Sequence, residues 1–471
     1  MAKKNKYTEL IANTGALAIG NFSSKILVFL LVPLYTSVLT TEEYGFYDLV
    51  FTTIQLLIPV FTCNVTDAVL RFTLESENHI KQLVNITLKF LVLSLLPAFL
   101  TLLAITASGI SRSTREYGGY IFAFYLFYML NQYLIQLAKG TDNVKRMAAA
   151  GVVGTLVTVI SCLIMLLIIK TGLKGFFLSN ILGQAVPAVY LICTLHLWKY
   201  VDIGISLDLE LQRRLLKYSL PLILTNIGWW LNNTSDKYII TFMSGMSLNG
   251  LLSVAYKIPS ILSIIYGLFI QAWQISAIKE YTSEDSRSFY NRVFLYLNIF
   301  VYCVAAALIL FTKPIARLAF AKDFYSAWEF VPFLLISGVF TASAGFIAPI
   351  LTSAYNTKAV VKSTIYGGIV NIFLNIVLLY CIGPQGVSIA TAISSFVIFY
   401  VRYHGLGGII ERKNLWRILL LWLLLIIQSA AELLGWYGAE LFILAIAFIW
   451  NFKHVYELIQ KLKSFFINRY K

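Results

Sequence analysis

Four side chains set inside long apolar segments are the first candidates for chemistry in this chain. Asn21 and Lys25 lie in the first segment, and Asn233 and Lys237 lie in the seventh. Side chains four residues apart share one face of a helix, so each Asn–Lys pair forms one polar surface. A cation within hydrocarbon costs at least about 2.5 kcal/mol, so we expect both surfaces to line a hydrated, protein-walled cavity. Two lysines in such a cavity favour an anion between them, and a phosphate would accept hydrogen bonds from both.

Each lysine has an ordinary alternative, which is to pair with a carboxylate or to extend its ammonium to the membrane surface. Asp236 precedes Lys237, but consecutive side chains on a helix point about 100° apart, so Asp236 is an imperfect partner. Lys257, in the eighth segment, is the third candidate cation. It lies nearer the end of its segment, where its ammonium could reach the surface.

Three carboxylates, Asp48, Asp67 and Asp236, could bind a proton or a sodium ion. Asp48 opens the second segment, where the positive end of the helix dipole also favours a carboxylate with no such role. Asp67 lies one turn before Arg71, near the opposite end of that segment. These two side chains form either a local ion pair or a gate at which Arg71 binds an anionic head-group.

Amides form a second polar set inside the apolar segments, and aromatic side chains accompany them. Buried amides commonly bridge transmembrane helices, and Trp or Tyr commonly anchor helices at the membrane surface. A cavity that binds sugars would use the same kinds of side chain. The amides are Gln55, Asn64, Asn131, Gln132, Gln136, Asn180, Gln184, Asn226, Gln271, Gln274, Asn371 and Asn375, and the aromatic residues are Trp229, Trp230, Tyr266 and Trp273.

The composition places these side chains in a membrane protein. Hydrophobic residues make up 59% of the 471 residues, charged residues make up 13%, and the mean hydropathy is +0.78. A helix needs about 20 apolar residues to cross a bilayer, and about fourteen segments meet this requirement. We therefore predict an all-α integral membrane protein. The predicted spans are 12–39, 46–70, 84–107, 118–138, 147–169, 176–197, 217–244, 250–274, 289–311, 326–353, 361–382, 386–408, 416–433 and 439–456.

The distribution of charge predicts the orientation in the membrane. The formal net charge is +15, and most Lys and Arg residues fall in one set of short loops and in the two tails. Cytoplasmic loops carry such an excess, so both termini are predicted to be cytoplasmic, which requires an even number of spans. This orientation accounts for the positive charge without nucleic acid as a partner.

Repeated landmarks indicate two homologous halves. The Asn–Lys pair of the first segment recurs 212 positions later, and the turn at Gly172 recurs 211 positions later at Gly383. Pro59 and Pro259 permit bends in corresponding spans. Two six-helix lobes of equal orientation would place a site between them near the bilayer midplane. The predicted parts are an N-lobe (1–197), a cytoplasmic linker (198–216), a C-lobe (217–409), two further helices (410–456) and an amphipathic cytoplasmic tail (457–471).

The sequence contains no set of residues typical of catalysis or of metal binding. It lacks the Walker A, GxSxG and HExxH motifs, and the loops between the spans are too short for a catalytic domain. The five cysteines lie in apolar spans and the four histidines are scattered. We therefore expect no enzyme activity, no metal site and no cofactor beyond a coupling proton or sodium ion.

The start of the chain resembles a known family. Residues 13–16 (NTGA) and 39–48 (LTTEEYGFYD) are similar to the start of polysaccharide flippases of the O-antigen (Wzx) type. These flippases belong to the multidrug/oligosaccharidyl-lipid/polysaccharide (MOP) exporter superfamily. They have polar residues and a lysine in helix 1, then a proline and the pattern L-(T/S)-x-x-E-(Y/F)-G at the entry to helix 2. The layout of six, six and two helices is similar over essentially the whole chain.

The resemblance implies that the protein moves a polyprenyl-diphosphate-linked oligosaccharide from the cytoplasmic to the outer leaflet by alternating access, for surface polysaccharide such as O-antigen or capsule. It implies a location in the bacterial cytoplasmic (inner) membrane, with the lipid bilayer and polysaccharide polymerase or assembly proteins as partners. Cationic residues of the cavity would meet the diphosphate, a role that fits Lys25, Lys237 and Lys257. The alternative within the same superfamily is a cation-coupled exporter of drugs or other small molecules, against which a lysine in helix 1 argues.

Overall fold

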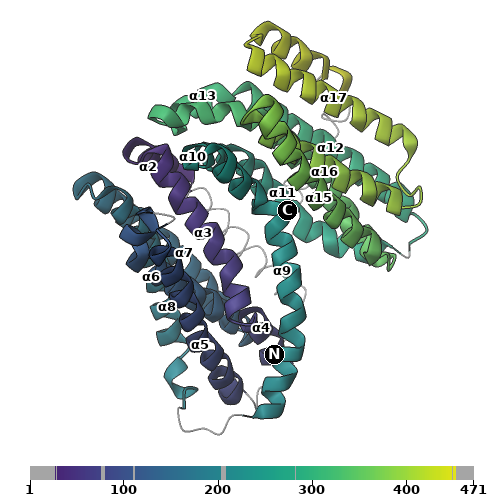
Figure 1. The fold of residues 1–471 in the computed structure, drawn as a ribbon. Coiled ribbons are helices and arrows are strands. Elements are labelled where there is room, and N and C mark those ends of the chain that lie inside the picture. Colours follow the sequence, from purple (N-terminus) through teal and green to yellow (C-terminus); the bar gives the residue numbers. More distant parts are fainter. Residues whose placement is uncertain are drawn as a thin grey trace, which may run out of the picture. The chain divides into compact units, whose positions relative to one another are not determined.

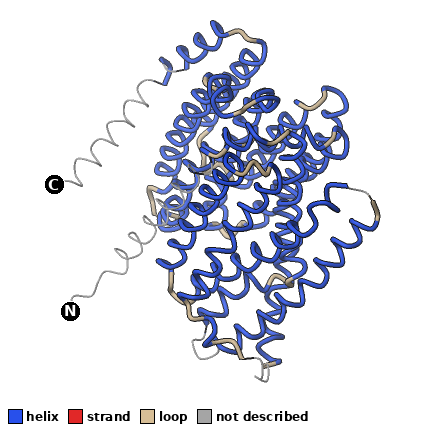
Figure 2. The backbone as a smooth tube through the Cα atoms, turned by 90° about the vertical axis from the view of Figure 1, so that its left-hand side faces the viewer, coloured by secondary structure: helices blue, strands red, loops and turns tan. Residues whose placement is uncertain are grey.

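The described part of the protein is entirely helical. The computed structural model describes residue 27 and residues 29–75, 80–109, 112–202, 208–281, 283–447 and 449–451. Within these ranges the chain forms helices joined by short turns, with no β-strand (Figure 1, Figure 2). It divides into two compact units, Met1–Thr234 and Ser235–Lys471.

In the described part of the chain, the first unit is built from nine elements and from the first part of a tenth. They are α2 (Val32–Val38), α3 (Thr41–Phe61), α4 (Val65–Glu75), α5 (Ile80–Ala107), α6 (Arg112–Gly140), α7 (Val144–Leu163) continued by the π-helix η2 (Ile164–Ile168), α8 (Gly172–Thr194), the short 3-10 helix η3 (Leu197–Lys199) and α9 (Leu209–Ser244). Helix α8 packs against α6 and α7, and α6 also packs against α4. These contacts place α6 at the centre of the unit.

The second unit begins within α9 and contains the remaining helices. They are α10 (Met246–Ala255), α11 (Lys257–Glu280), α12 (Ser286–Leu310), α13 (Thr312–Ala319), the 3-10 helix η4 (Lys322–Phe330), α14 (Val331–Ser353), α15 (Thr357–Ile382), α16 (Gln385–Gly405) and α17 (Arg412–Leu434). A further apolar helix covers Tyr437–Asn451. Helix α14 is the most buried of them, packed against α11, α12 and α16. The predicted lobe and linker boundaries stay predictions.

Eleven helices in the described part of the chain are long and apolar enough to cross a membrane, and they overlap predicted spans two to six and eight to thirteen. The prediction of an all-α membrane protein is therefore confirmed, while the total of fourteen spans and the cytoplasmic termini stay predictions. Helix α9, the predicted seventh span, is not among the eleven. Its 36 residues, about 54 Å of helix, are long enough, but polar residues interrupt its apolar sequence. A helix of this kind needs a polar environment along part of its length.

The residues that carry the family resemblance start helix α3. The Glu43 N–H donates to Thr40 Oγ1 (3.1 Å), and the Thr40 N–H donates to Glu43 Oε2 (2.8 Å), which is a complete capping box. These two bonds satisfy backbone groups that would otherwise lack partners at a helix start. The pattern L-T-T-E-E-Y-G thus has a local structural cause, because it fixes where α3 begins.

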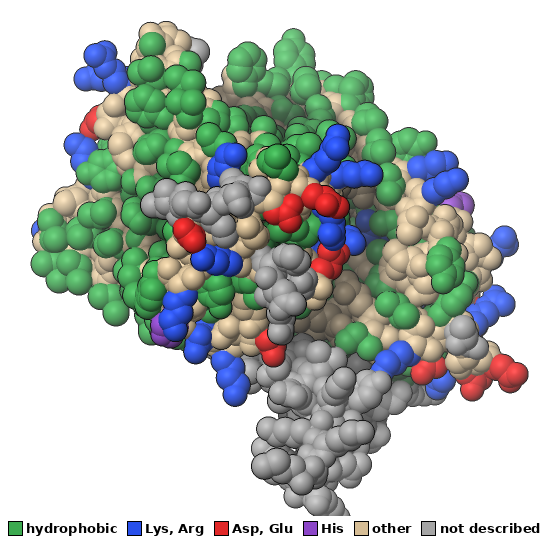
Figure 3. Space-filling model, turned by 90° about the horizontal axis from the view of Figure 1, so that it is seen from below, with side chains coloured by type: hydrophobic (Ala, Val, Ile, Leu, Met, Phe, Trp, Pro, Cys, Tyr) green, Lys and Arg blue, Asp and Glu red, His purple; other side chains and the backbone are tan. Residues whose placement is uncertain are grey.

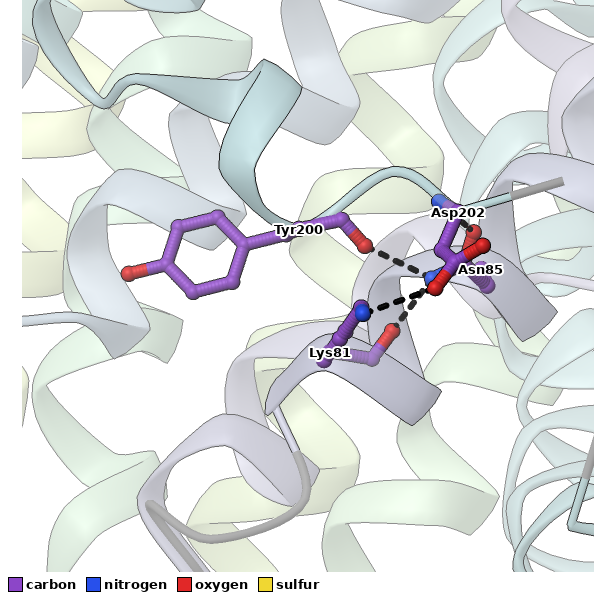
Figure 4. A network of polar contacts seen from close by, with 4 residues as sticks. All are labelled: Lys81, Asn85, Tyr200 and Asp202. Carbon is purple, nitrogen blue, oxygen red and sulfur yellow. Dashed lines mark hydrogen bonds and ion pairs between the residues drawn. The ribbon is translucent and has the colours of Figure 1, made fainter. Parts of the chain in front are cut away.

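Polar contacts fasten the segment after α8 to the start of α5 (Figure 4). Asn85 Nδ2 donates to the carbonyl oxygens of Lys81 and Tyr200, each at 2.7 Å, and Asn85 Oδ1 accepts from the Asp202 N–H at 2.9 Å. Lys81 Nζ lies 2.8 Å from Asp202 Oδ2. The predicted linker is therefore held at its beginning.

Charged side chains are gathered on the face of the molecule in Figure 3, as expected for a surface that meets water.

We predict that Asn85→Leu destabilises this attachment. The substitution removes two hydrogen bonds to residues 200 and 202 and leaves their backbone groups without this partner, which costs about 1–3 kcal/mol. The measurement is the midpoint of thermal unfolding in detergent, together with the rate of proteolysis between residues 198 and 208. The matched control is Lys81→Met, which removes only a half-exposed ion pair worth less than about 1 kcal/mol. Equal effects of the two variants would contradict this account.

Candidate functional site

A break between α3 and α4 interrupts the predicted second span. Helix α3 ends at Phe61, two residues after Pro59, and α4 starts at Val65. In the break, Cys63 and Asn64 have φ angles of 52° and 55°, the left-handed region that Asn tolerates better than most residues. The Asn64 N–H donates to the Pro59 carbonyl oxygen at 2.8 Å, so the turn satisfies part of its own backbone.

A cavity of about 260 Å³ lies beside this break, wholly within the first unit. Helices α3, α4, α6 and α9 supply its walls. Its lining is rich in amide and aromatic side chains that the sequence analysis placed in a set of sugar-binding candidates. The lining residues are Gln55, Ile58, Pro59, Asn64, Thr66, Asp67, Tyr128, Gln132, Gln136, Asn226, Trp229 and Trp230.

Asn226 of α9 is the centre of the hydrogen bonds around the cavity. Its Nδ2 donates to Asn64 Oδ1 and to Asp67 Oδ2, each at 3.1 Å. One amide thereby connects α9 to the break and to the first turn of α4. Trp230 Nε1, one turn further along α9, donates to the Thr52 carbonyl oxygen at 2.8 Å. These bonds fix α9 against α3 and α4 next to the cavity.

Two polar atoms of the lining have no protein partner. Asn64 Nδ2 and Gln136 Oε1 are buried and make no hydrogen bond within the described part of the chain. Asn64 is only 1% exposed, so its free N–H would cost free energy unless water or a ligand accepts it. The wall of the cavity therefore includes one buried amide nitrogen and one buried amide oxygen without a hydrogen-bond partner in the described part of the chain.

The arrangement is suited to a neutral polar ligand with many hydroxyl groups. Amides donate and accept at once, as hydroxyls do, and the indole and phenol rings give flat apolar surfaces. Among the described residues of the lining, Asp67 is the charged one. Of the basic residues predicted to bind an anion, Arg71, Lys237 and Lys257 are not in this lining, and Lys25 lies outside the described residues.

Arg71 makes a different ion pair from the predicted pair with Asp67. Its Nε donates to Glu75 Oε1 at 3.0 Å, and its guanidinium lies 4.5 Å from the centre of the Tyr218 ring. Arg214 Nη2 donates to the other oxygen of Glu75 at 3.2 Å. The hydrogen bond that Arg71 donates to Glu75 raises the pKa of the Arg71 guanidinium above its ordinary value. Asp67 bonds Asn226 instead, so these two residues belong to separate contacts.

The predicted anion-binding residues are only partly described by the structure. Asn21 and Lys25 lie outside the described residues. Lys237 is half-buried in α9. Asn233 Nδ2 donates to the Trp229 carbonyl oxygen of the same helix at 2.6 Å. Lys257 is half-buried and begins α11.

The other two predicted ion-coupling carboxylates are buried. Asp236 in α9 is 3% exposed, and its carboxylate accepts hydrogen bonds from the Tyr256 hydroxyl and from the Lys237 N–H. Tyr256 directly precedes Lys257, so this bond brings α9 to the start of α11. Asp48 is 8% exposed in the second turn of α3. In the described ranges no group of three or more His, Cys, Asp or Glu side chains could hold a metal ion.

The sequence analysis missed a buried ionic cluster in the second unit. Glu432 of α17 and Glu440 of the following helix are both fully buried. Lys313 Nζ lies 3.6 Å from Glu432 Oε1 and donates to the Glu432 carbonyl oxygen at 2.9 Å. The ammonium also lies 4.4 Å from the ring centre of Trp328. The available signal was two glutamates inside the last two apolar segments.

A second missed cation is Arg402, inside α16. Its Nε donates to Ser363 Oγ and its Nη1 donates to the Ala344 carbonyl oxygen, both at 2.9 Å. These bonds join α16 to α15 and α14. The contacts indicate a structural role, because both acceptors of Arg402 belong to helices packed against α16.

Comparisons with known proteins match both the sequence and the fold. A family model described as "Polysaccharide biosynthesis protein" matches residues 10–275. No match was found among curated proteins. A structure of the lipid II flippase MurJ in an inward closed conformation has a TM-score of 0.69 and 16% identity, covering 94% of this chain and 99% of that chain.

Two structures of multidrug resistance MATE family transporters of the MOP superfamily are also similar. The inward-facing one has a TM-score of 0.67 and 16% identity, covering 86% of this chain and 98% of that chain. The outward-facing one has a TM-score of 0.58 and 15% identity, covering 87% of this chain and 96% of that chain. The flippase structure and the two transporter structures therefore share the fold of this chain.

We predict that Asn226→Ala lowers the stability of the first unit. The substitution leaves Asn64 and Asp67 without their donor, and the cost is about 1–3 kcal/mol because Asn64 is buried. The measurement is the midpoint of thermal unfolding of the full chain in detergent. The matched control is Asn180→Ala, which removes an amide that bonds the Phe176 carbonyl oxygen of its own helix. A loss no larger than that of the control would show that the bridge is unimportant.

Proposed function

Because the chain belongs to the polysaccharide biosynthesis protein family, we propose that it is a flippase for a polyprenyl-diphosphate-linked oligosaccharide. It moves this lipid from the cytoplasmic to the outer leaflet of the bacterial cytoplasmic membrane, and the oligosaccharide is then built into a surface polysaccharide of the O-antigen or capsule type. Fold similarity to a lipid II flippase supports the class of substrate, a lipid-linked sugar. Polymerase or assembly proteins receive the product.

The observation that carries the proposal is the amide-rich and aromatic cavity of the first unit. A sugar ring presents hydroxyls at its edge and C–H groups at its faces. The amides of Gln132, Gln136 and Asn226 are suited to hydrogen bonds with the hydroxyls. The rings of Trp229 and Tyr128 are suited to packing against the C–H faces. In this proposal the cavity holds part of the glycan.

The lysines supply the site for the diphosphate. Lys25, Lys237 and Lys257, with Asn21 and Asn233 on the faces of the first two, provide charge and hydrogen-bond donors to phosphate oxygens. Lysine is a point charge with a flexible stem, so it can release the head-group as well as bind it. Arg71 serves a head-group at the cytoplasmic entrance only when it leaves Glu75.

Alternating access requires places where helices bend. The break between α3 and α4 is one, and the junction of α10 and α11 at Tyr256, three residues before Pro259, is another. They lie in the predicted second and eighth spans, which correspond in the two halves. The similar MATE transporters adopt inward-facing and outward-facing forms of this fold. Asp48, Asp67 and Asp236 are the candidates to couple the change to a proton or a sodium ion.

A second candidate function is a cation-coupled exporter of drugs or other small molecules. One observation favours it: the charged side chain in the described lining of the cavity is the carboxylate of Asp67. A cationic drug would be attracted by this carboxylate, whereas the diphosphate of a lipid-linked sugar would need the lysines. The substrate test below separates the two functions.

We predict that Lys25→Ala and Lys237→Ala each abolish or strongly reduce flipping, by about tenfold or more, with folded protein left in the membrane. The protein is reconstituted in liposomes carrying a labelled polyprenyl-diphosphate oligosaccharide, and the rate at which the label becomes accessible across the bilayer is measured. The control is Lys358→Ala, which removes an exposed lysine from the first turn of α15. Normal flipping by both the Lys25→Ala and the Lys237→Ala variants would refute the lysine assignment.

We also predict that Gln136→Leu slows flipping of the oligosaccharide lipid more than that of the same lipid carrying a single sugar. The substitution keeps roughly the volume of the side chain and removes an amide that, in this proposal, bonds a sugar beyond the first one of the glycan. The measurement compares the two rates in the same liposomes. Equal slowing of both lipids would show that the cavity does not bind the glycan. Transport of an organic cation that Asp67→Asn abolishes would favour the exporter.

A further inference from the structure

Two cavities of the second unit adjoin each other along α16 and α17. One has a volume of about 880 Å³ and the other about 430 Å³. Phe396 of α16 and Leu419 of α17 line both, so the two cavities are neighbours along these helices, and together they are called the groove. Among the described residues, those proposed above for the transported substrate do not line this groove.

The larger cavity is basic at the end where α16 stops and α17 starts. Arg287 from the first turn of α12, Arg412 at the start of α17 and His404 in the last turn of α16 line it, and Glu411 is the acidic residue in the lining. Arg287 Nη2 donates to the Gly408 carbonyl oxygen at 3.3 Å, which holds the guanidinium beside the loop between the two helices. The predicted orientation places this end at the cytoplasmic surface.

The smaller cavity is apolar throughout. Its lining consists of apolar side chains of α14, α16 and α17, among them Phe340, Ala392, Ile393, Phe396, Trp422 and Leu423. The Trp422 ring lies 4.8 Å from Phe340 and 4.8 Å from Phe399, so packed rings support the wall. Ile393 and Leu423 on its rim are 40% and 51% exposed, so the groove opens towards the surroundings of the helices.

The length of the groove matches one leaflet. From Arg412 to Ile426, α17 rises about 21 Å at 1.5 Å per residue. Half of a bilayer, head-groups included, is about 20–22 Å thick. A groove with basic residues at the surface and only apolar residues beyond them has the polarity of a phospholipid with an anionic head-group.

We propose that this groove binds one anionic phospholipid of the cytoplasmic leaflet. Its phosphate lies at Arg287 and Arg412, and one acyl chain follows α16 and α17 past Phe396 to Trp422. Guanidinium groups bind phosphate through two parallel hydrogen bonds, which favours this head-group over one whose charge is balanced by its own ammonium. The bound lipid fills the space between α16 and α17 and thereby stabilises the attachment of α17 to the second unit.

The test is lipid binding by the purified full chain. The protein in detergent is offered equal amounts of phosphatidylglycerol and phosphatidylcholine, and retained lipid is counted by native mass spectrometry, with the shift of the unfolding midpoint as a second readout. We expect selective retention of phosphatidylglycerol and a larger midpoint shift with it. Each of Arg287→Gln and Arg412→Gln should lower this selectivity by about fivefold, as expected for one basic residue at a membrane surface.

Two further variants separate the site from general surface charge. Lys413→Gln removes an exposed cation next to Arg412 that lines neither cavity, and its selectivity should equal that of the unaltered protein. Ala392→Phe fills the apolar half and should reduce retention of both lipids. Equal retention of the two lipids, or an equal effect of Lys413→Gln, would overturn the proposal. Displacement of phosphatidylglycerol by polyprenyl diphosphate at equal concentration would also overturn it and assign the groove to the transported lipid.

Discussion

The hydrocarbon of a bilayer offers no hydrogen-bond partner, and the structure of this chain follows from that constraint. Every polar group within the membrane must find its partner in the protein, in trapped water or in a ligand. The amide of Asn226 shows the result most directly, because it donates to Asn64 in the break between α3 and α4 and to Asp67 in the first turn of α4. The cavity beside this bridge is polar because the break needs polar residues around it.

The apolar segments were predictable because their cause is local. About 20 apolar residues cross a bilayer in any fold, so most helices coincide with predicted spans. The break at residues 62–64 was harder to predict from the sequence, because Pro59 permits a bend but does not show that the helix ends there. The amides were recognised singly, but only the folded chain separates Asn131, which bonds Gln184, from Gln136, which faces a cavity.

The ionic contacts were the least predictable part. Arg71 has a carboxylate one turn before it and another one turn after it, and spacing alone cannot choose between Asp67 and Glu75. The choice depends on α9, because Asn226 donates a hydrogen bond to Asp67 and Arg214 donates one to Glu75. Lys313 and Glu432 are more than a hundred residues apart, so no local pattern connects them. Lys25, the cation predicted in the first span, lies outside the described residues.

The left-handed backbone of Asn64 has a consequence for how such a protein can diverge. Few residue types adopt a φ of 55° at low cost, and Asn, Asp and Gly are the principal ones. The same position contributes a polar group to the cavity wall. Few substitutions at position 64 are therefore tolerated when the substrate changes, because most residue types would deform the helix break. Changes in specificity should accumulate instead at positions such as 132 and 136, whose helical backbone accepts almost any side chain.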